Sequence, residues 1–153
     1  KRVYVTLGED WSHRNRGGLL ACFDAGGQGD LTTRGKVWIY TNLTQSVSSV
    51  VVDQGVAYAT DLAGRLHCLD ADTGAVQWVF ETGAPCWQTP LVADGKVYLG
   101  NSRGRFYILR HGRKLEQLCM VSLRKEMAGS PIAANGVVYI ATYGMLYALA
   151  PKK

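Results

Sequence analysis

The sequence predicts an all-β fold, a β-propeller segment of about three and a half four-stranded antiparallel blades. The first observation is a repeat. The strings DQGVAYAT, ADGKVYLG and ANGVVYIA contain Gly55, Gly95 and Gly136 at the same place, with a period of about 40 residues. The next strand repeats as well, in GRLHCLD, GRFYILR and GMLYALA, whose first glycines follow the same period. The third observation is composition, because 18 glycines with 10% aromatic residues are typical of many turns and packed rings.

The clearest repeat contains four short strands, SSVVVD, VAYATD, RLHCLD and VQWVFET, between residues 48 and 82. Turn-forming pairs separate these strands at Gln54-Gly55, Ala63-Gly64 and Thr73-Gly74. Four antiparallel strands in about 40 residues match one propeller blade. A helical solenoid of the same period would need apolar residues at helical spacing, and these runs are too short and too rich in Val and Tyr.

The repeat defines one partial propeller domain, 1–153, with blades at about 2–46, 47–87, 88–128 and 129–150. The first blade lacks its innermost strand and the last lacks its outermost strand. Because propellers have about 4–8 blades, we expect the C-terminal part of a larger propeller, packed against its remaining blades. The alternative is a homodimer in which two chains close a seven-bladed ring.

Charge and hydropathy exclude several classes of protein. The chain is 47% hydrophobic and 19% charged, as expected of a folded domain, and its net charge is +5. The basic residues form no stripe with interleaved aromatic residues, so we expect no nucleic-acid partner. No apolar run reaches the length of a membrane span.

The titratable residues do not form a recognisable catalytic or metal-binding pattern. The four cysteines, at positions 22, 68, 86 and 119, share no Cys-x-x-Cys spacing. We therefore expect no zinc site and interpret the cysteines as small buried residues, with a disulfide as the less favoured alternative. His67 lies on a strand, where packing is the expected role. No Ser, His and Asp fall into a defensible triad, so no catalytic residue is predicted.

The stretch LDADTGAVQW resembles the tryptophan-docking motif of PQQ-like (quinoprotein-type) β-propellers, and the repeats resemble those of BamB-type propellers. Cys68 stands in the usual Ala position, followed by Asp70, Gly74 and Trp78. Trp38 precedes Trp78 by one period and occupies the same position of the preceding repeat. The resemblance implies that both tryptophans pack between neighbouring blades and have a structural role.

The resemblance also implies a test for a cofactor. PQQ-dependent alcohol dehydrogenases of this family have a vicinal Cys–Cys disulfide beside the cofactor, together with Glu, Asn and Asp ligands for Ca²⁺. This sequence has no adjacent Cys pair, and those ligands do not map onto it. We therefore expect no cofactor, and PQQ with calcium remains an expectation only if the chain is part of a quinoprotein oxidoreductase.

The first repeat contains an insertion in GEDWSHRNRGG, between its second and third strands. In a propeller blade, the loops at this position share one face with the linkers between blades, and the resemblance places the ligand funnel of the dehydrogenases on that face. Loops on a rigid scaffold often carry function. The candidate interaction face comprises Trp11, His13, Arg14, Arg16, Trp87, Gln88, Asn101, Arg103, Lys125 and Tyr143.

Three functions follow as hypotheses. The first is a non-catalytic scaffold that binds protein partners in the bacterial cell envelope or periplasm, as the propeller lipoprotein of the outer-membrane β-barrel assembly machinery does in this family. The second is part of a PQQ-dependent alcohol or sugar dehydrogenase. The third is a small-ligand sensor in which Trp11 and Trp87 are stacking platforms.

Overall fold

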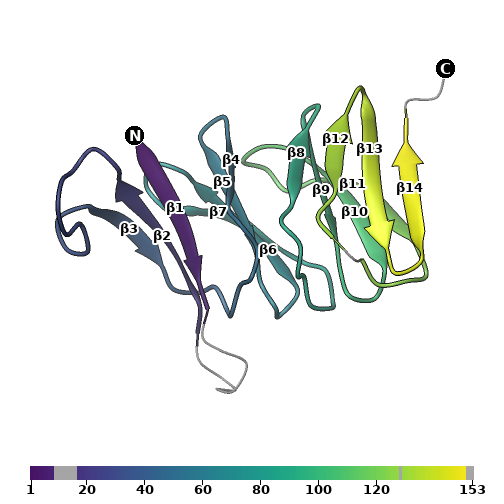
Figure 1. The fold of residues 1–153 in the computed structure, drawn as a ribbon, viewed down its shortest axis with the longest axis horizontal. Helices are drawn as coiled ribbons and strands as arrows, with labels where there is room; N and C mark the ends of the chain where they lie inside the picture. The colour runs from purple at the N-terminus through teal and green to yellow at the C-terminus, as the bar shows by residue number, and fades with distance from the viewer. Residues whose placement is uncertain (9–16, 128, 151–153) are drawn as a thin grey trace.

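The computed structural model describes residues 1–8, 17–127 and 129–150 as a row of four antiparallel sheets (Figure 1). The first two sheets contain β1 (Arg2–Leu7), β2 (Leu19–Asp24) and β3 (Lys36–Tyr40), and then β4 (Val51–Asp53), β5 (Val56–Thr60), β6 (Arg65–Asp70) and β7 (Val76–Glu81). The last two contain β8 (Leu91–Ala93), β9 (Lys96–Gly100), β10 (Arg105–Arg110) and β11 (Gln117–Ser122), and then β12 (Ile132–Ala134), β13 (Val137–Thr142) and β14 (Met145–Leu149). The described residues form no helix, so the all-β propeller prediction is confirmed.

Each sheet is a meander whose strands pair in chain order. The first three sheets share one irregularity, a register shift that skips one residue of the outermost strand, Val37, Gln77 and Leu118 in turn. On the neighbouring strand it falls between Cys22 and Phe23, between Cys68 and Leu69, and at Ile108 and Leu109. The repeat therefore extends to the backbone, because a bulge at the same place bends the outer edge of each sheet in the same way.

The strands divide among the sheets as three, four, four and three. The first and last sheets thus each have three strands among the described residues, and the two middle sheets have four.

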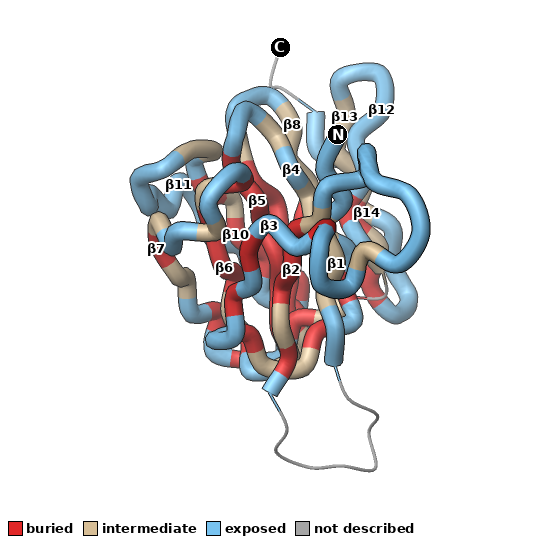
Figure 2. Tube along the Cα trace, turned by 90° about the vertical axis from the view of Figure 1, so that its left-hand side faces the viewer, coloured by how far each residue is buried: buried red, intermediate tan, exposed pale blue. Residues whose placement is uncertain are grey.

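The core lies between the sheets, and Figure 2 shows buried residues concentrated on their middle strands. One buried cluster joins Tyr58 and Leu66 of the second sheet to Leu99 and Leu109 of the third. A second cluster joins the first two sheets, and a third joins the last two. Burial of both faces explains why β5 is entirely buried, whereas β11 and β12 are exposed along their whole length.

The predicted docking tryptophans lie in equivalent positions between sheets. The Trp38 indole N–H donates to the carbonyl of Ala71 at 3.0 Å, and the Trp78 indole N–H donates to the carbonyl of Gly112 at 3.0 Å. Each bond thus links the outermost strand of one sheet to the turn of the next. Gly74 receives the ring of Trp38, since a Cβ at this position would lie 2.7 Å from the indole.

Three of the four cysteines are buried, as predicted from the sequence. Cys22, Cys68 and Cys86 are buried, and all four thiols are free. Cys119 is exposed, which corrects the expectation for this residue. The physical reason is its place on β11, where neither face is covered.

Candidate functional site

One end of the molecule gathers loops from three sheets and is called here the lower face, because it is the lower edge in Figure 1. It contains the turns at 61–64, 101–104 and 143–144 and the linkers at 82–90 and 123–131. Six predicted interaction residues lie in these segments: Trp87, Gln88, Asn101, Arg103, Lys125 and Tyr143. The other four, Trp11, His13, Arg14 and Arg16, lie outside the described residues.

Three of these six residues line one pocket of about 360 Å³. The lining residues come from the linker between the second and third sheets, the linker between the third and fourth sheets, and the turn of the fourth sheet. We call it the Trp87–Tyr143 pocket; its lining is Trp87, Gln88, Glu126, Met127, Gly129, Ser130 and Tyr143. Its volume lies at the lower end of the range for small-ligand sites, about 300–1,000 Å³.

Hydrogen bonds between side chains and main chain fix the position of the two linkers against each other. The Gln88 side-chain nitrogen donates to the carbonyl of Met127 at 3.1 Å, and the amide of Thr89 donates to the Ser130 hydroxyl at 3.0 Å. The amide of Tyr143 donates to the carbonyl of Glu126 at 3.1 Å. The pocket is therefore held by hydrogen bonds that each include a main-chain group, which is the rigid support that a binding site needs.

Gln88 leaves one polar atom unsatisfied beside this pocket. Its side chain is buried, and its side-chain oxygen has no hydrogen-bond partner among the described residues. The hydrogen bond from the amide nitrogen to Met127 fixes the orientation of the Gln88 amide. If the amide were flipped, its oxygen would face the carbonyl oxygen of Met127, and two acceptors would oppose each other. A buried acceptor without a partner is uncommon and costs free energy.

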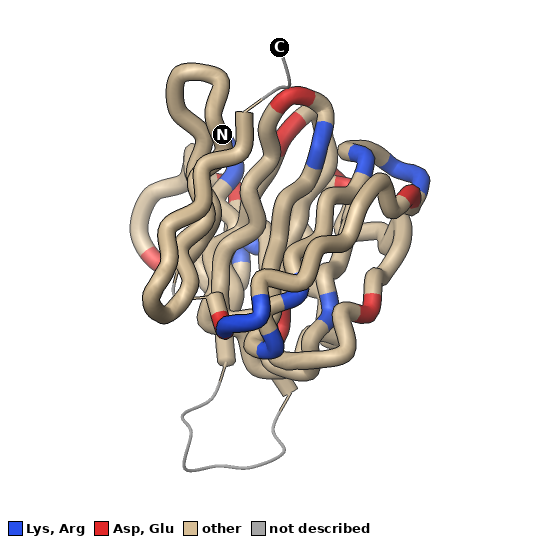
Figure 3. Tube along the Cα trace, turned by 90° about the vertical axis from the view of Figure 1, so that its right-hand side faces the viewer, with Lys and Arg blue, Asp and Glu red and all other residues tan. Residues whose placement is uncertain are grey.

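The remaining predicted residues do not enter the pocket. Asn101 is fully buried; its side chain accepts from the amides of Arg103 and Arg105 and donates to the carbonyl of Thr82. It stabilises its own turn and offers no surface to a partner, unlike the exposed role expected for it. Arg103 donates to the carbonyl of Gly83 at 3.2 Å. Lys125 is exposed and directly precedes Glu126, which lines the pocket. Figure 3 shows several Lys and Arg positions at the lower end of the molecule.

A buried polar network near the same face was not predicted. The Asp61 carboxylate has no exposed surface and accepts from Arg65 at 2.7 Å, while 3.0 Å separates it from the His67 ring nitrogen. The other ring nitrogen of His67 is hydrogen-bonded to the Tyr40 hydroxyl of the first sheet at 3.0 Å. Burial alone would raise the pKa of Asp61, but the hydrogen bonds from His67 and Arg65 hold it well below the ordinary value.

One signal in the sequence could have revealed this network. Asp61 and Asn101 occupy the same position in consecutive repeats, directly after a strand. Both side chains accept hydrogen bonds from the turn that follows. A polar residue that recurs at a fixed place in consecutive repeats indicates a structural hydrogen bond. Asp61 differs from Asn101 at this place in carrying a charge.

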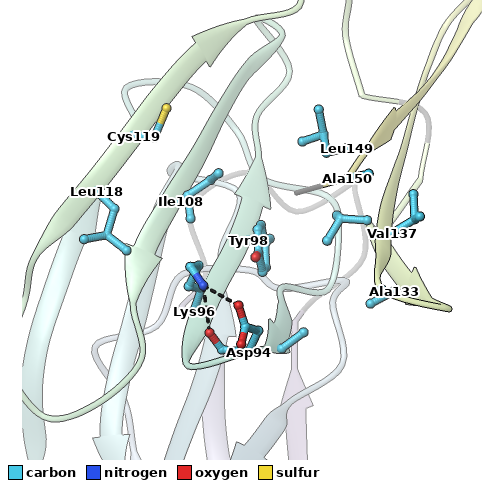
Figure 4. Close-up of a pocket in the computed structure, with 13 residues that line it drawn as sticks. Asp94, Lys96, Tyr98, Ile108, Leu118, Cys119, Ala133, Val137, Leu149 and Ala150 are labelled. Atoms are coloured by element: carbon cyan, nitrogen blue, oxygen red, sulfur yellow. Dashed lines mark hydrogen bonds and ion pairs between the residues drawn. The ribbon is translucent and has the colours of Figure 1, made fainter. Parts of the chain in front are cut away.

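A larger cavity of about 770 Å³ lies between the third and fourth sheets (Figure 4). Its walls include Tyr98, Ile108 and Leu118 on one side and Val137 and Leu149 on the other. Cys119 pairs with Ile108 as Trp78 pairs with Cys68 and Trp38 with Cys22, so it holds the position that the docking tryptophan fills in the two preceding sheets. The smaller cysteine leaves this space between the sheets, so the cavity is a departure from the repeat in packing. Its charged lining residues, Asp94 and Lys96, are already paired with each other.

The titratable side chains of the described residues form no metal cluster and include two thiols with raised pKa values. No three His, Cys, Asp or Glu side chains among them come together in a way that could hold a metal ion. Burial raises the pKa of Cys68 to about 12 and that of Cys86 to about 11, so neither thiol ionises near neutral pH.

Comparisons with known proteins agree with this architecture. Among the solved structures, BamB from Moraxella catarrhalis superposes with a TM-score of 0.66 at 14% identity, over 85% of this chain and 36% of that one. The quinohemoprotein alcohol dehydrogenase ADHIIG from Pseudomonas putida HK5 superposes with a TM-score of 0.60 at 18% identity, over 80% of this chain and 25% of that one. The quinohemoprotein alcohol dehydrogenase from Comamonas testosteroni gives 0.55 at 20% identity, over 62% and 17%. At these identities the likeness shows the fold.

The fold and its repeats thus define a PQQ-like β-propeller protein. The sequence profile of the family described as outer membrane protein assembly factor BamB matches residues 16–153, and the chain belongs to this family. None of the curated protein sequences matches it. The chain spans about a third of the length of the BamB structure that it resembles. Within the described residues, no helical segment has the length and hydropathy of a membrane-crossing helix.

Proposed function

We propose that the protein is a non-catalytic propeller scaffold that binds protein partners through its lower face in the bacterial cell envelope, without a cofactor. The observation that carries the proposal is the Trp87–Tyr143 pocket, which combines Trp, Tyr and Met side chains beside exposed basic residues. Protein interfaces are enriched in aromatic residues, Met and Arg. Tyr143 is 66% exposed, a large aromatic surface for a residue on a rigid turn.

The envelope location rests on the family alone. The matching profile is described by a role in outer membrane protein assembly, and the first structural neighbour is a BamB protein. The role in outer membrane protein assembly and the name BamB belong to those proteins, and we extend the envelope location to this chain as part of the proposal.

The second candidate is a PQQ-dependent dehydrogenase, favoured by the likeness to two quinohemoprotein alcohol dehydrogenases. Native mass spectrometry of the full-length protein, with and without PQQ and Ca²⁺, separates the two functions. The scaffold predicts an unchanged mass of the protein in the presence of PQQ and Ca²⁺. A one-to-one adduct with PQQ would overturn the scaffold and favour the dehydrogenase.

A further inference from the structure

The Trp87–Tyr143 pocket departs from the repeat in a way that the fold does not require. In the preceding repeat, the positions of Trp87 and Gln88 hold Val47 and Ser48. Ser48 fulfils a structural role, because its hydroxyl donates to the carbonyl of Thr60 at 3.3 Å. The Gln88 amide nitrogen has a comparable structural role through its bond to Met127. The features that this role does not explain are the unsatisfied oxygen of Gln88 and the larger aromatic side chain of Trp87, and a ligand provides an explanation for both.

From this departure we propose that the pocket binds the guanidinium group of an arginine side chain of the partner protein. The inference rests on the proposed function and specifies the partner's chemistry. The first argument is the side-chain oxygen of Gln88, a residue that lines the pocket; this oxygen is a buried acceptor and lacks a partner among the described residues. Such an oxygen favours a ligand with N–H donors, since a donor removes the cost of leaving the acceptor unsatisfied.

The second argument is charge. Glu126 is the one formally charged residue among those that line the pocket, and it is half-buried. Arg124 and Lys125 precede it in the same linker, but neither lines the pocket. The net charge of +5 opposes long-range attraction of a basic partner. Recognition of a cation is therefore expected to depend on short-range contacts inside the pocket, with little electrostatic steering.

The third argument is the pair of aromatic side chains. Trp87 and Tyr143 come from different segments and line the same pocket. An arginine guanidinium stacks on aromatic faces and carries five N–H donors in one plane. It can therefore contact an aromatic ring, the Glu126 carboxylate and the Gln88 oxygen at once. A lysine ammonium has three donors and no plane to stack.

Titration of ¹⁵N-tryptophan-labelled full-length protein tests this inference, with the indole N–H signal of Trp87 as the readout. That signal is assigned as the one lost in Trp87→Phe. The probe is N-acetyl-arginine methylamide, and the control is the citrulline analogue, which has nearly the same shape without the charge. The lysine analogue is the third probe. Glu126→Gln and Gln88→Leu alter the pocket, and Asp72→Asn removes a carboxylate from an exposed turn at the opposite end.

The inference predicts a saturable shift of the Trp87 signal with the arginine probe and binding of citrulline that is weaker by roughly tenfold, since the ion pair and the cation–π contact are lost. Glu126→Gln and Gln88→Leu should each weaken arginine binding, whereas Asp72→Asn should not. An absent shift would indicate that water alone satisfies Gln88 and would overturn the inference. Equal binding of arginine and citrulline, or of arginine and lysine, would also overturn it. Because Glu126 is not buried, its variant keeps the test valid if Gln88→Leu fails to fold. Native mass spectrometry tests the scaffold independently of this result.

Discussion

The indole nitrogen of Trp78 donates a 3.0 Å hydrogen bond to the carbonyl of Gly112 on the neighbouring sheet. Trp38 repeats the relationship with Ala71 at the same distance, one sheet earlier. These sheets meet through side chains and not through a shared strand. Each indole therefore contributes both van der Waals packing and a hydrogen bond to the contact between two sheets. Trp78 also contacts the ring of Tyr58, with ring centroids 5.8 Å apart.

Replacement of Trp78 should therefore destabilise the protein strongly. Trp78→Ala should lower the free energy of unfolding by about 3–5 kcal/mol, through loss of a buried aromatic side chain and the cavity left behind. Urea titration followed by circular dichroism measures the change. Trp87→Ala is the control on the lower face, where the side chain is only partly buried, and should cost less than about 1 kcal/mol. Equal losses for the two variants would contradict the docking role.

Gly74 offers a second test of the same interface. Its φ is +73°, and an added Cβ would lie 2.7 Å from the Trp38 ring. Gly74→Ala should cost about 2–4 kcal/mol, because backbone strain and a steric clash act together. Gly95→Ala has a comparable φ of +63° but no atom within 4 Å of the new Cβ, so it isolates the strain, about 1–2 kcal/mol. Similar melting temperatures for both variants would argue against close packing of Trp38 on Gly74.

Cys119 allows the converse experiment. Cys119→Trp should restore the side chain that the two preceding sheets carry at this register position and bury part of the cavity in Figure 4, raising the free energy of unfolding by about 1 kcal/mol. Leu146→Trp is the matched control, since Leu146 is 69% exposed and does not line the cavity. A stabilisation of both variants, or of neither, would mean that the cavity does not arise from the missing indole.

Acid should lower the free energy of unfolding through protonation of Asp61. Its pKa in the folded state lies below the ordinary value of about 4. The charged form is thus favoured in the folded protein, and this stabilisation is present above the unfolded-state pKa and is lost as the pH falls toward the folded-state pKa. Asp61→Asn should cost roughly 3–5 kcal/mol at pH 7, since it breaks a buried ion pair with Arg65 and alters the hydrogen bond with His67.

The difference between wild type and Asp61→Asn measures this linkage. Urea midpoints between pH 7 and about pH 3 should converge for the two proteins as the pH falls. Asp72→Asn, at an exposed turn, should follow the wild-type curve. Parallel curves for wild type and Asp61→Asn would show that the carboxylate charge is not the source of the stability.

The fold could be predicted from the sequence because the repeat is visible in short strings whose glycines return with a constant period. The pocket could not, because Glu126 and Met127 lie in a linker without a pattern and reach Trp87 only through tertiary contacts. Asn101 was expected at the surface because it lies in a loop, yet its amide caps that loop from inside. Asp61 was missed because a turn carboxylate gives no sign of its burial until the neighbouring sheet is in place.

Site-specific photo-crosslinking in living cells tests the central claim most directly, that partners bind the lower face. Benzoylphenylalanine replaces Tyr143 beside the pocket or Asp72 at the opposite end of the full-length protein; both positions are exposed. The account predicts a discrete adduct with another protein from position 143 that is absent from position 72 and is lost in Trp87→Ala. The same adducts from both positions, or an adduct from position 143 that persists in Trp87→Ala, would contradict it.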